Sequence, residues 1–142
     1  MEPMLDTAPC GFLSVRDDGS IQQVNRTLQE WLGYTLDELQ HQPIDSILPA
    51  AGRIFYQTHL FPLVKIQGKV LEVYFPLRQK DGNDIPMLVN AARRDGGLVY
   101  DFVFMPMHQR DRYENEILRA KAAAEEARRA KEEAYTDLEA FA

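Results

Sequence analysis

One histidine lies in the middle of the apolar segment "RIFYQTHLFPLVKIQGKV", residues 53–70. At helical spacing, one face of this segment carries Phe55, His59, Leu63 and Ile66. An imidazole on such a face can ligate a haem iron, hydrogen-bond to a small molecule, or lie buried against a backbone carbonyl. The sequence leaves these three roles of His59 open.

Two other residues could contact a bound molecule. Asn90 interrupts the apolar strand "IPMLVNAARR", and alternation turns inward either Leu88, Asn90 and Ala92 or the residues between them. A buried amide needs hydrogen-bond partners, which a ligand or the backbone must supply. Trp31 lies on the predicted helix "RTLQEWLGY", where its ring could stack on a flavin or pack against a sheet.

The sequence shows no set of residues with the order and spacing of a catalytic or metal site. Its histidines, His41, His59 and His108, lack metal-ligand spacing, and no glycine-rich phosphate loop is present. The single cysteine, Cys10, excludes internal disulfides and a multi-cysteine zinc site. We therefore predict that the chain is not an enzyme and holds no metal ion.

The composition is that of a folded, acidic protein. The chain has 142 residues, of which 45% are hydrophobic, and its net charge is −6. Binding to nucleic acid or to an anionic membrane needs clustered Lys and Arg, so neither partner is expected. The N-terminal "MEPMLDTAPCG" lacks the basic and apolar regions of a signal peptide, and no apolar run approaches the ~20 residues of a membrane span. We expect a soluble, cytoplasmic protein.

The C-terminal part, residues 109–142, has a different character. It contains neither Gly nor Pro and consists mostly of Ala, Glu, Arg and Lys, which favour a long helix. Apolar side chains recur at alternating intervals of four and three residues, the pattern of a coiled coil. They form a predicted dimer seam, which Lys131 interrupts. The seam residues are Tyr113, Ile117, Ala120, Ala124, Ala127, Ala134, Leu138 and Phe141. A solvated single helix held by charge pairs is the alternative.

Alanine buries little surface, so the pairing of two such helices should be weak and able to slip. A slipping seam suits a linker that transmits a signal. The final "DLEAFA" carries no helix stop signal, and we expect the sequence to continue into a further domain.

Residues 10–108 form the predicted globular domain, preceded by a short cap segment, residues 1–9. Two short strands flank an Asp-Gly turn, and Asn25 is a predicted N-cap for the helix that follows. Several short helices come next, with Pro62 expected to kink or restart one of them. After Gly68 the apolar period changes to two, and one side of the expected strand carries Leu71, Val73, Phe75 and Leu77. Three strands in a meander complete an α+β fold, an antiparallel sheet with short helices over one face.

The stretches "DDGSIQQVNRTLQEWLGYTLDEL" and "RQKDGNDIPMLVNAARRDGG" resemble the two conserved patterns of PAS domains, in the same order and at similar spacing. The resemblance covers nearly all of residues 10–107 and implies the five-stranded PAS fold. It implies a sensory or dimerisation module of a bacterial multidomain signalling protein. The closing "DLEAFA" resembles the stretch before the phosphoacceptor helix of histidine kinases, so the expected output is a histidine kinase of a two-component system. Phosphatase and cyclase outputs use similar linkers and are the alternatives.

The resemblance also implies a pocket or a packed core between the sheet and the helices. Comparison with flavin-binding PAS domains favours the inward set that contains Asn90. The candidate pocket residues are Trp31, Phe55, His59, Leu63, Val73, Phe75, Leu88, Asn90, Phe102 and Phe104. The cofactor is unknown; haem on His59, a flavin near Trp31 and Asn90, or no cofactor are the options.

Two functions follow from these observations. In the first, a change at the pocket alters the last strand, Leu98 to Met107, and shifts the helix that follows. Asp111 stands at the place of a conserved junction aspartate and either couples the two parts or caps the helix. In the second, the domain binds no ligand and simply holds two chains together.

Overall fold

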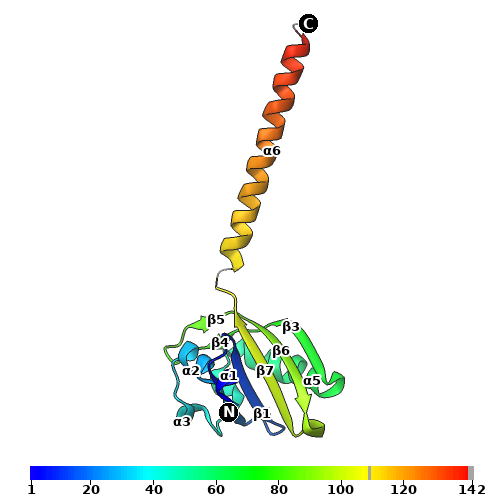
Figure 1. Ribbon diagram of the computed structural model, residues 1–142. Helices are drawn as coiled ribbons and strands as arrows, with labels where there is room; N and C mark the ends of the chain where they lie inside the picture. Colours follow the sequence, from blue (N-terminus) through cyan, green and yellow to red (C-terminus); the bar gives the residue numbers. More distant parts are fainter. Residues whose placement is uncertain (109, 141–142) are drawn as a thin grey trace. The chain divides into compact units, whose positions relative to one another are not determined.

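The computed structural model describes residues 1–108 and 110–140, with side chains for residues 1–108 and 115–138. The chain divides into two compact units, Met1–Met107 and His108–Ala142. The first unit holds the sheet and the short helices, and the second consists mainly of one long helix (Figure 1).

The first unit is built on a five-stranded antiparallel sheet, which confirms the predicted fold class. Its strands lie in the order β2-β1-β7-β6-β3, so β7 is the central strand. Their bounds are β1 (Gly11–Arg16), β2 (Ile21–Val24), β3 (Lys69–Tyr74), β6 (Met87–Arg94) and β7 (Val99–Pro106). A separate two-stranded hairpin is formed by β4 (Leu77–Arg78) and β5 (Asp84–Ile85).

Short helices connect β2 to β3 and cover one face of the sheet (Figure 1). They are α2 (Arg26–Leu32), α3 (Leu36–Leu39), the 3₁₀-helix η1 (Ile44–Ile47), α4 (Ala50–Phe55), the π-helix η2 (Tyr56–Leu60) and α5 (Phe61–Gln67). Two further short helices are α1 (Pro3–Asp6) and the 3₁₀ turn η3 (Asp95–Gly97). The hydrophobic core lies between this helical layer and the sheet.

The predicted helix boundaries have the expected local causes. The Asn25 side chain accepts a hydrogen bond from the backbone N–H of Leu28 and caps α2. Gly33 ends α2 with a φ of 81°, in the left-handed region that favours glycine. Thr35 and Glu38 form the predicted capping box of α3.

The prediction of one uninterrupted strand after Gly68 is wrong. A bulge between Val70 and Val73 interrupts the pairing of β3 with β6, and Glu72 there takes a φ of 58°. The bulge changes the alternation of side chains, so Leu71 is 56% exposed although Phe75 further along is buried. A bulge has no clear signal in a sequence, because it depends on the partner strand.

Pro62 neither breaks nor ends the helical segment in which it lies. The preceding turn is a π-helix, and the Phe61 N–H that closes it donates to the Tyr56 carbonyl. Pro62 has no N–H to donate, and it directly follows this π turn as the second residue of α5. We predicted that the helix kinks or restarts at Pro62. The structure shows instead a π turn followed by α5, within one run of helical backbone.

The second unit contains α6 (Arg110–Ala140), the long helix predicted for residues 109–142. Arg128 pairs with Glu132 at 2.8 Å and with Glu125 at 3.1 Å, the side-chain spacing that stabilises an exposed helix. No described helix is long and apolar enough to cross a membrane.

The side chain of Asn25 ties three segments of the first unit together. It is fully buried, and its Oδ1 accepts hydrogen bonds from the N–H groups of Phe12 at 2.9 Å and Leu28 at 3.1 Å. Its Nδ2 donates to the carbonyls of Leu5 and Cys10, both at 2.9 Å. The N-terminal segment, β1 and α2 therefore share one buried amide.

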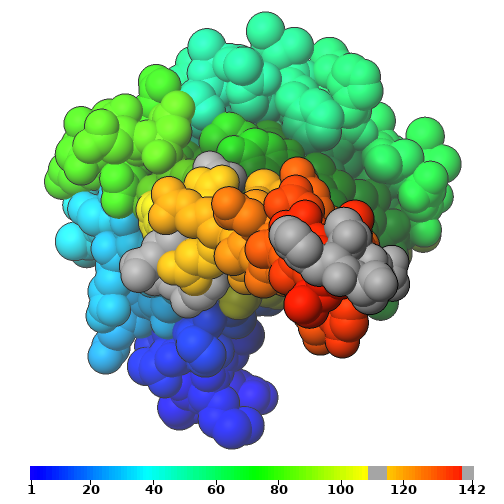
Figure 2. Space-filling view, turned by 90° about the horizontal axis from the view of Figure 1, so that it is seen from above, coloured from blue at the N-terminus to red at the C-terminus, as the bar shows by residue number. Residues whose placement is uncertain are grey.

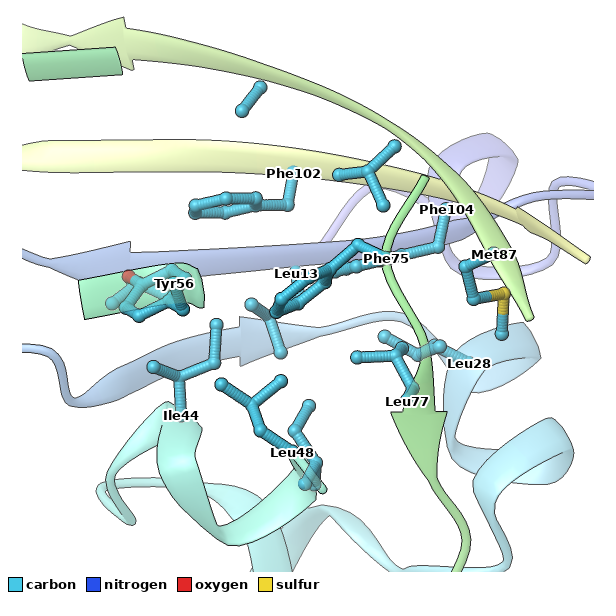
Figure 3. Packing of buried hydrophobic residues seen from close by; sticks show 14 of the residues in the cluster. Leu13, Leu28, Ile44, Leu48, Tyr56, Phe75, Leu77, Met87, Phe102 and Phe104 are labelled. Carbon is cyan, nitrogen blue, oxygen red and sulfur yellow. The ribbon is translucent and has the colours of Figure 1, made fainter. Parts of the chain in front are cut away.

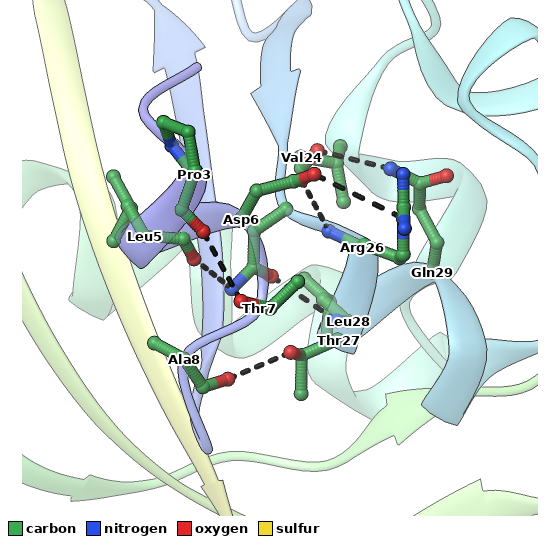
Figure 4. Close-up of polar contacts among 11 residues, drawn as sticks. Pro3, Leu5, Asp6, Thr7, Ala8, Val24, Arg26, Thr27, Leu28 and Gln29 are labelled. Atoms are coloured by element: carbon green, nitrogen blue, oxygen red, sulfur yellow. Dashed lines mark hydrogen bonds and ion pairs between the residues drawn. The ribbon is translucent and has the colours of Figure 1, made fainter.

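Further polar contacts fasten the N-terminal segment to the start of α2 (Figure 4). The Arg26 N–H donates to Asp6 Oδ1 at 2.9 Å, and Thr27 Oγ1 donates to the Ala8 carbonyl at 2.6 Å. The cap segment expected over residues 1–9 thus packs on the domain through hydrogen bonds.

Replacing the side-chain amide of Asn25 should destabilise the whole first unit. We expect Asn25→Ala to lower the free energy of unfolding by about 2–4 kcal/mol, because a helix cap is lost and buried partners are left unpaired. Urea unfolding followed by circular dichroism measures the change. The matched control is Gln23→Ala on the exposed face of β2, expected within about 0.5 kcal/mol of the parent. Equal stability of both variants would contradict this role of Asn25.

Candidate ligand-binding site

Aromatic side chains fill the space between the sheet and the helices (Figure 3). Phe75, Phe102 and Phe104 are at most 1% exposed, so these candidate pocket residues do point inward. The Tyr56 ring joins them, with its centroid 6.3 Å from that of Phe75 and 6.2 Å from that of Phe102. The rings pack against one another, and this region is a core.

The inward orientation predicted for the His59 face is wrong. His59 is exposed, Phe55 and Leu63 are 37% and 39% exposed, and Ile66 is 80% exposed. The His59 ring stacks on that of Phe55 at 5.6 Å, and its Nδ1 lies 2.7 Å from Thr58 Oγ1. The helical segment near residues 50–60, green-cyan in Figure 2, lies on the outer surface of the unit. His59 is therefore not placed to ligate a haem in the core.

The buried face of this segment carries Tyr56, Leu60 and Val64. These residues follow one another at the same spacing of four as Phe55, His59 and Leu63. Both faces are largely apolar, so periodicity alone could not choose between them. Contacts of Tyr56 with rings on β7 and after β3 decide the orientation.

Comparison with flavin-binding domains favoured Leu88, Asn90 and Ala92 as the residues of β6 that face inward. This prediction is also wrong. Val89 lies opposite Phe104 and Ala91 opposite Phe102, so the face with Met87 is the buried one. Asn90 is exposed and Leu88 is half-buried on the other face. Asn90 Oδ1 accepts a hydrogen bond from the N–H of Glu72 at 2.8 Å. The bulge in β3 thus supplies the partner of this amide.

The two remaining candidates lie at the margin of the core. Val73 and Trp31 are half-buried and pack against it. Trp31 also borders a surface hollow of about 380 Å³, where its carbonyl accepts a hydrogen bond from Gln79 Nε2 at 2.9 Å. Nothing in this geometry singles out a flavin site.

The structure describes some of the predicted seam residues of α6 but not all of them. Ile117 and Leu138 are 63% and 69% exposed in the single chain. Ala120, Ala124, Ala127 and Ala134 also lie in α6 and are exposed. Asp111 and Tyr113 belong to α6, but their side chains lie outside the described residues, and Phe141 lies outside them entirely. The dimer seam and the coupling role of Asp111 remain predictions.

The structure reveals a polar group in the core that the sequence analysis missed. Tyr56 is only 4% exposed, and its hydroxyl has no hydrogen-bond partner among the residues that the structure describes. Figure 3 shows this hydroxyl at the end of the ring that points away from Leu13 and Phe75. Tyr56 borders a half-open cavity of about 200 Å³, together with Phe61 and Asp45, but its hydroxyl oxygen is itself shielded from this open space. A buried, unpaired hydroxyl is rare and needs a physical explanation.

Carboxylates surround this cavity, which we call the Tyr56 cavity. Asp17 and Asp18 in the β1–β2 turn and Asp45 in η1 line it, and Asp45 Oδ2 accepts from Gln57 Nε2 at 3.0 Å. Burial, with smaller effects from Asp45 and Tyr100, raises the pKa of the Tyr56 phenol above its ordinary value of 10.0. The phenol therefore keeps its proton at neutral pH.

Tyr100 links this region to the central strand. It lies on β7, its ring meets that of Phe61 edge-on at 4.8 Å, and its hydroxyl donates to Asp17 Oδ1 at 3.4 Å. Lys65 Nζ pairs with the same Asp17 oxygen at 3.4 Å. Tyr100 on β7 thus contacts two residues that line the Tyr56 cavity.

A second surface hollow, of about 360 Å³, lies beside the N-terminal segment. Gln22 borders it with an unpaired Oε1, but this residue is only half-buried. Among the described residues, no group of three or more His, Cys, Asp or Glu side chains could hold a metal ion. The Tyr56 cavity is the strongest candidate site because its unpaired polar group is almost fully buried.

The family model of the PAS fold matches residues 1–98. The chain therefore belongs to the PAS family. A PAS domain from Colwellia psychrerythraea superposes with a TM-score of 0.68 at 14% identity, over 75% of this chain and 92% of that one. A domain of a sensory box sensor histidine kinase/response regulator from Geobacter sulfurreducens gives a TM-score of 0.58 at 16% identity, over 70% and 86%. These likenesses support the fold.

A curated relative is more similar in sequence. The phosphoserine phosphatase RsbP of Bacillus subtilis is 42% identical over 128 residues, which cover 89% of this chain. Since the first unit ends at Met107, a match of that extent includes part of α6. The chain spans about a third (32%) of the length of this relative.

The unpaired phenol leads to a prediction about stability. We expect Tyr56→Phe to raise the free energy of unfolding by about 1 kcal/mol at pH 7, because an unsatisfied buried hydroxyl is removed. The raised folded-state pKa adds a pH dependence. Above the unfolded-state pKa of about 10, the unfolded chain releases a proton that the folded chain keeps, so the parent loses stability as pH rises.

Urea unfolding at pH 7 and at pH 11 measures both effects. The difference in the free energy of unfolding between Tyr56→Phe and the parent should be larger at pH 11 than at pH 7. Tyr74→Phe, at a position 58% exposed, should have the same free energy of unfolding as the parent at both pH values. A destabilised Tyr56→Phe would mean that the phenol has a partner, and a difference that does not change with pH would mean that its folded-state pKa is not raised.

Proposed function

We propose that this chain is a sensory input module that passes the state of the Tyr56 cavity through β7 and α6 to an attached output domain. The observation that carries the proposal is the position of Tyr100. This residue contacts the cavity residues Phe61 and Asp17 and lies on the strand that runs into α6. PAS family membership supports a role in signalling.

The transmitting element is a homodimeric coiled coil of α6. Ile117 and Leu138 lie on the predicted seam, and both are exposed large apolar side chains in the single chain. Between them the seam consists of alanine and Lys131, which gives little burial and allows two arrangements close in energy. Asp111, at the start of the helix, is proposed to couple the two units.

The output favoured by similarity is a phosphatase. The relative that supports it is a phosphoserine phosphatase, and its match includes part of the linker helix. A histidine kinase, the output expected from the sequence, has the support of a distant structural neighbour and of the closing "DLEAFA". Linkers of the same kind join PAS domains to either output, so an activity assay must decide.

A ligand-free dimerisation module is the second candidate. The ring contacts among Tyr56, Phe75 and Phe102 favour it, since they fill the interior in which a large cofactor would lie. The unpaired Tyr56 hydroxyl favours the sensor. The two functions differ in whether the register of α6 controls the output.

Insertions in α6 test this difference in the full-length protein. Duplicating Ala120–Glu126 adds one heptad and keeps the seam, whereas duplicating Ala123–Ala124 turns the downstream seam by about 200°. We expect the heptad insertion to keep the parent's activity and the two-residue insertion to change it by about fivefold or more. Phosphoserine hydrolysis and autophosphorylation are both measured. Parent-like activity in both variants would favour the dimerisation module.

The predicted seam has its own test on the isolated chain. We expect Ile117→Lys combined with Leu138→Lys to convert a dimer into a monomer, because charges replace the two aliphatic seam residues that are larger than alanine. Leu118→Lys is the matched control, since Leu118 is 62% exposed but lies off the seam. Sedimentation equilibrium measures the mass. A dimer that survives the double substitution would place the main dimer contact elsewhere.

A further inference from the structure

We infer that the outer face of the sheet carries a second dimer contact, which packs against the same face of another copy of this chain. The inference rests on the proposed pairing of α6 and adds a separate surface to it. This surface lies at the end of the sheet where β7 leads to α6, and we call it the outer sheet patch. Its residues are Phe12, Tyr74, Leu88, Val103 and Met105.

Strand register places these five side chains on one face. In one row across the sheet, Tyr74 lies opposite Leu88 and Leu88 opposite Met105. In the next outward row, Val103 lies opposite Phe12. The residues that alternate with them along β6 and β7 are buried in the core, so both rows point away from the helical layer.

The patch is apolar at a place where a solvated sheet is normally polar. Tyr74 and Met105 are 58% and 45% exposed, and the other three side chains are half-buried. An antiparallel sheet with one face toward water usually carries polar side chains on that face. The other half of this outer face does so, because Arg94 donates two hydrogen bonds to Asp101, at 2.7 and 3.0 Å. The apolar character is thus confined to the end of the sheet next to α6.

Charge and composition favour a second copy as the partner. No patch residue is charged, so two copies can face each other without repulsion between like charges. Asn90, in the same row as Val103, is also uncharged, and Glu72 lies in the bulge of the edge strand β3. Aromatic residues and Met are enriched in protein interfaces, and homodimer interfaces are more apolar than others. An anionic membrane would instead need clustered Lys and Arg.

The short connection to α6 supports the same partner. Residues 106–109 alone separate Met105 from Arg110, the first residue of α6. A chain spans at most about 3.6 Å per residue, so this connection reaches less than about 20 Å. Pairing of two α6 helices therefore keeps the β7 ends of both chains near each other. Such a tether gives a second contact an effective concentration of the order of millimolar.

The size of the patch limits its strength. A typical stable interface buries about 800 Å² on each partner. Five side chains, three of them already half-buried, offer much less than this. The contact therefore strengthens a dimer that α6 holds together and does not form a stable dimer without it.

Sedimentation equilibrium of the 142-residue chain measures the dimer dissociation constant. We expect Tyr74→Glu combined with Met105→Glu to raise this Kd about tenfold or more, and the matching pair of Lys substitutions to do the same. An equimolar mixture of the Glu and Lys variants should associate more tightly than either variant alone, because opposite charges then face each other. Circular dichroism checks that each variant keeps its fold.

The matched control is Ile54→Glu combined with Leu98→Glu. These residues are 66% and 69% exposed and lie outside the patch, so this variant should keep the Kd of the parent. An unchanged Kd in both patch variants, an equal rise in the control, or a mixture no tighter than its components would overturn the inference. Patch variants that keep the Kd but change the output of the full-length protein would mean that the output domain covers the patch.

Failure of this contact differs from failure of the proposed function. The seam substitutions in α6 test the helix pairing by itself, and the insertions in α6 test register control in the full-length protein. Patch variants that dimerise as the parent does, beside a monomeric seam variant, would remove the patch and keep the coiled coil.

Discussion

The helical segment that contains Pro62 is the constraint on which the rest of the domain depends. A proline has no N–H and its ring crowds the carbonyl four residues earlier, so an α-helix kinks or breaks at this position. A π turn over Tyr56–Leu60 places Pro62 at the start of α5 and keeps the helical path intact. This path presents Tyr56 to the sheet, where its ring contacts Phe75 and Phe102.

The same arrangement buries the Tyr56 hydroxyl without a partner, as the fully buried Ser14 hydroxyl on β1 also is among the described residues. A tyrosine among phenylalanines contributes as much packing as they do, yet its hydroxyl must leave the apolar region or remain unpaired. Here the hydroxyl points away from Leu13 and Phe75 (Figure 3), and Tyr56 lines a hollow together with carboxylates of the β1–β2 turn and η1. The central strand contributes Tyr100 to this margin, so a polar site and the strand leading to α6 meet at one place.

Local signals explain why much of the fold could be predicted. The caps at Asn25, Gly33 and Thr35 each depend on residues within one helical turn, and the structure confirms them. The orientation of longer elements could not be predicted in this way. The Phe55 and Tyr56 faces have the same spacing and similar hydrophobicity, and either face of β6 could be turned inward.

By itself, the sequence determined the order of the five strands of the main sheet, the PAS family pattern, the long C-terminal helix and the inward position of Phe75, Phe102 and Phe104. Only the tertiary structure decided that His59 and Asn90 face outward and that Tyr56 carries the buried hydroxyl. The physical reason is that turns and caps are satisfied by neighbours in the chain. The choice between two similar faces is instead made by strand register and ring packing across the core.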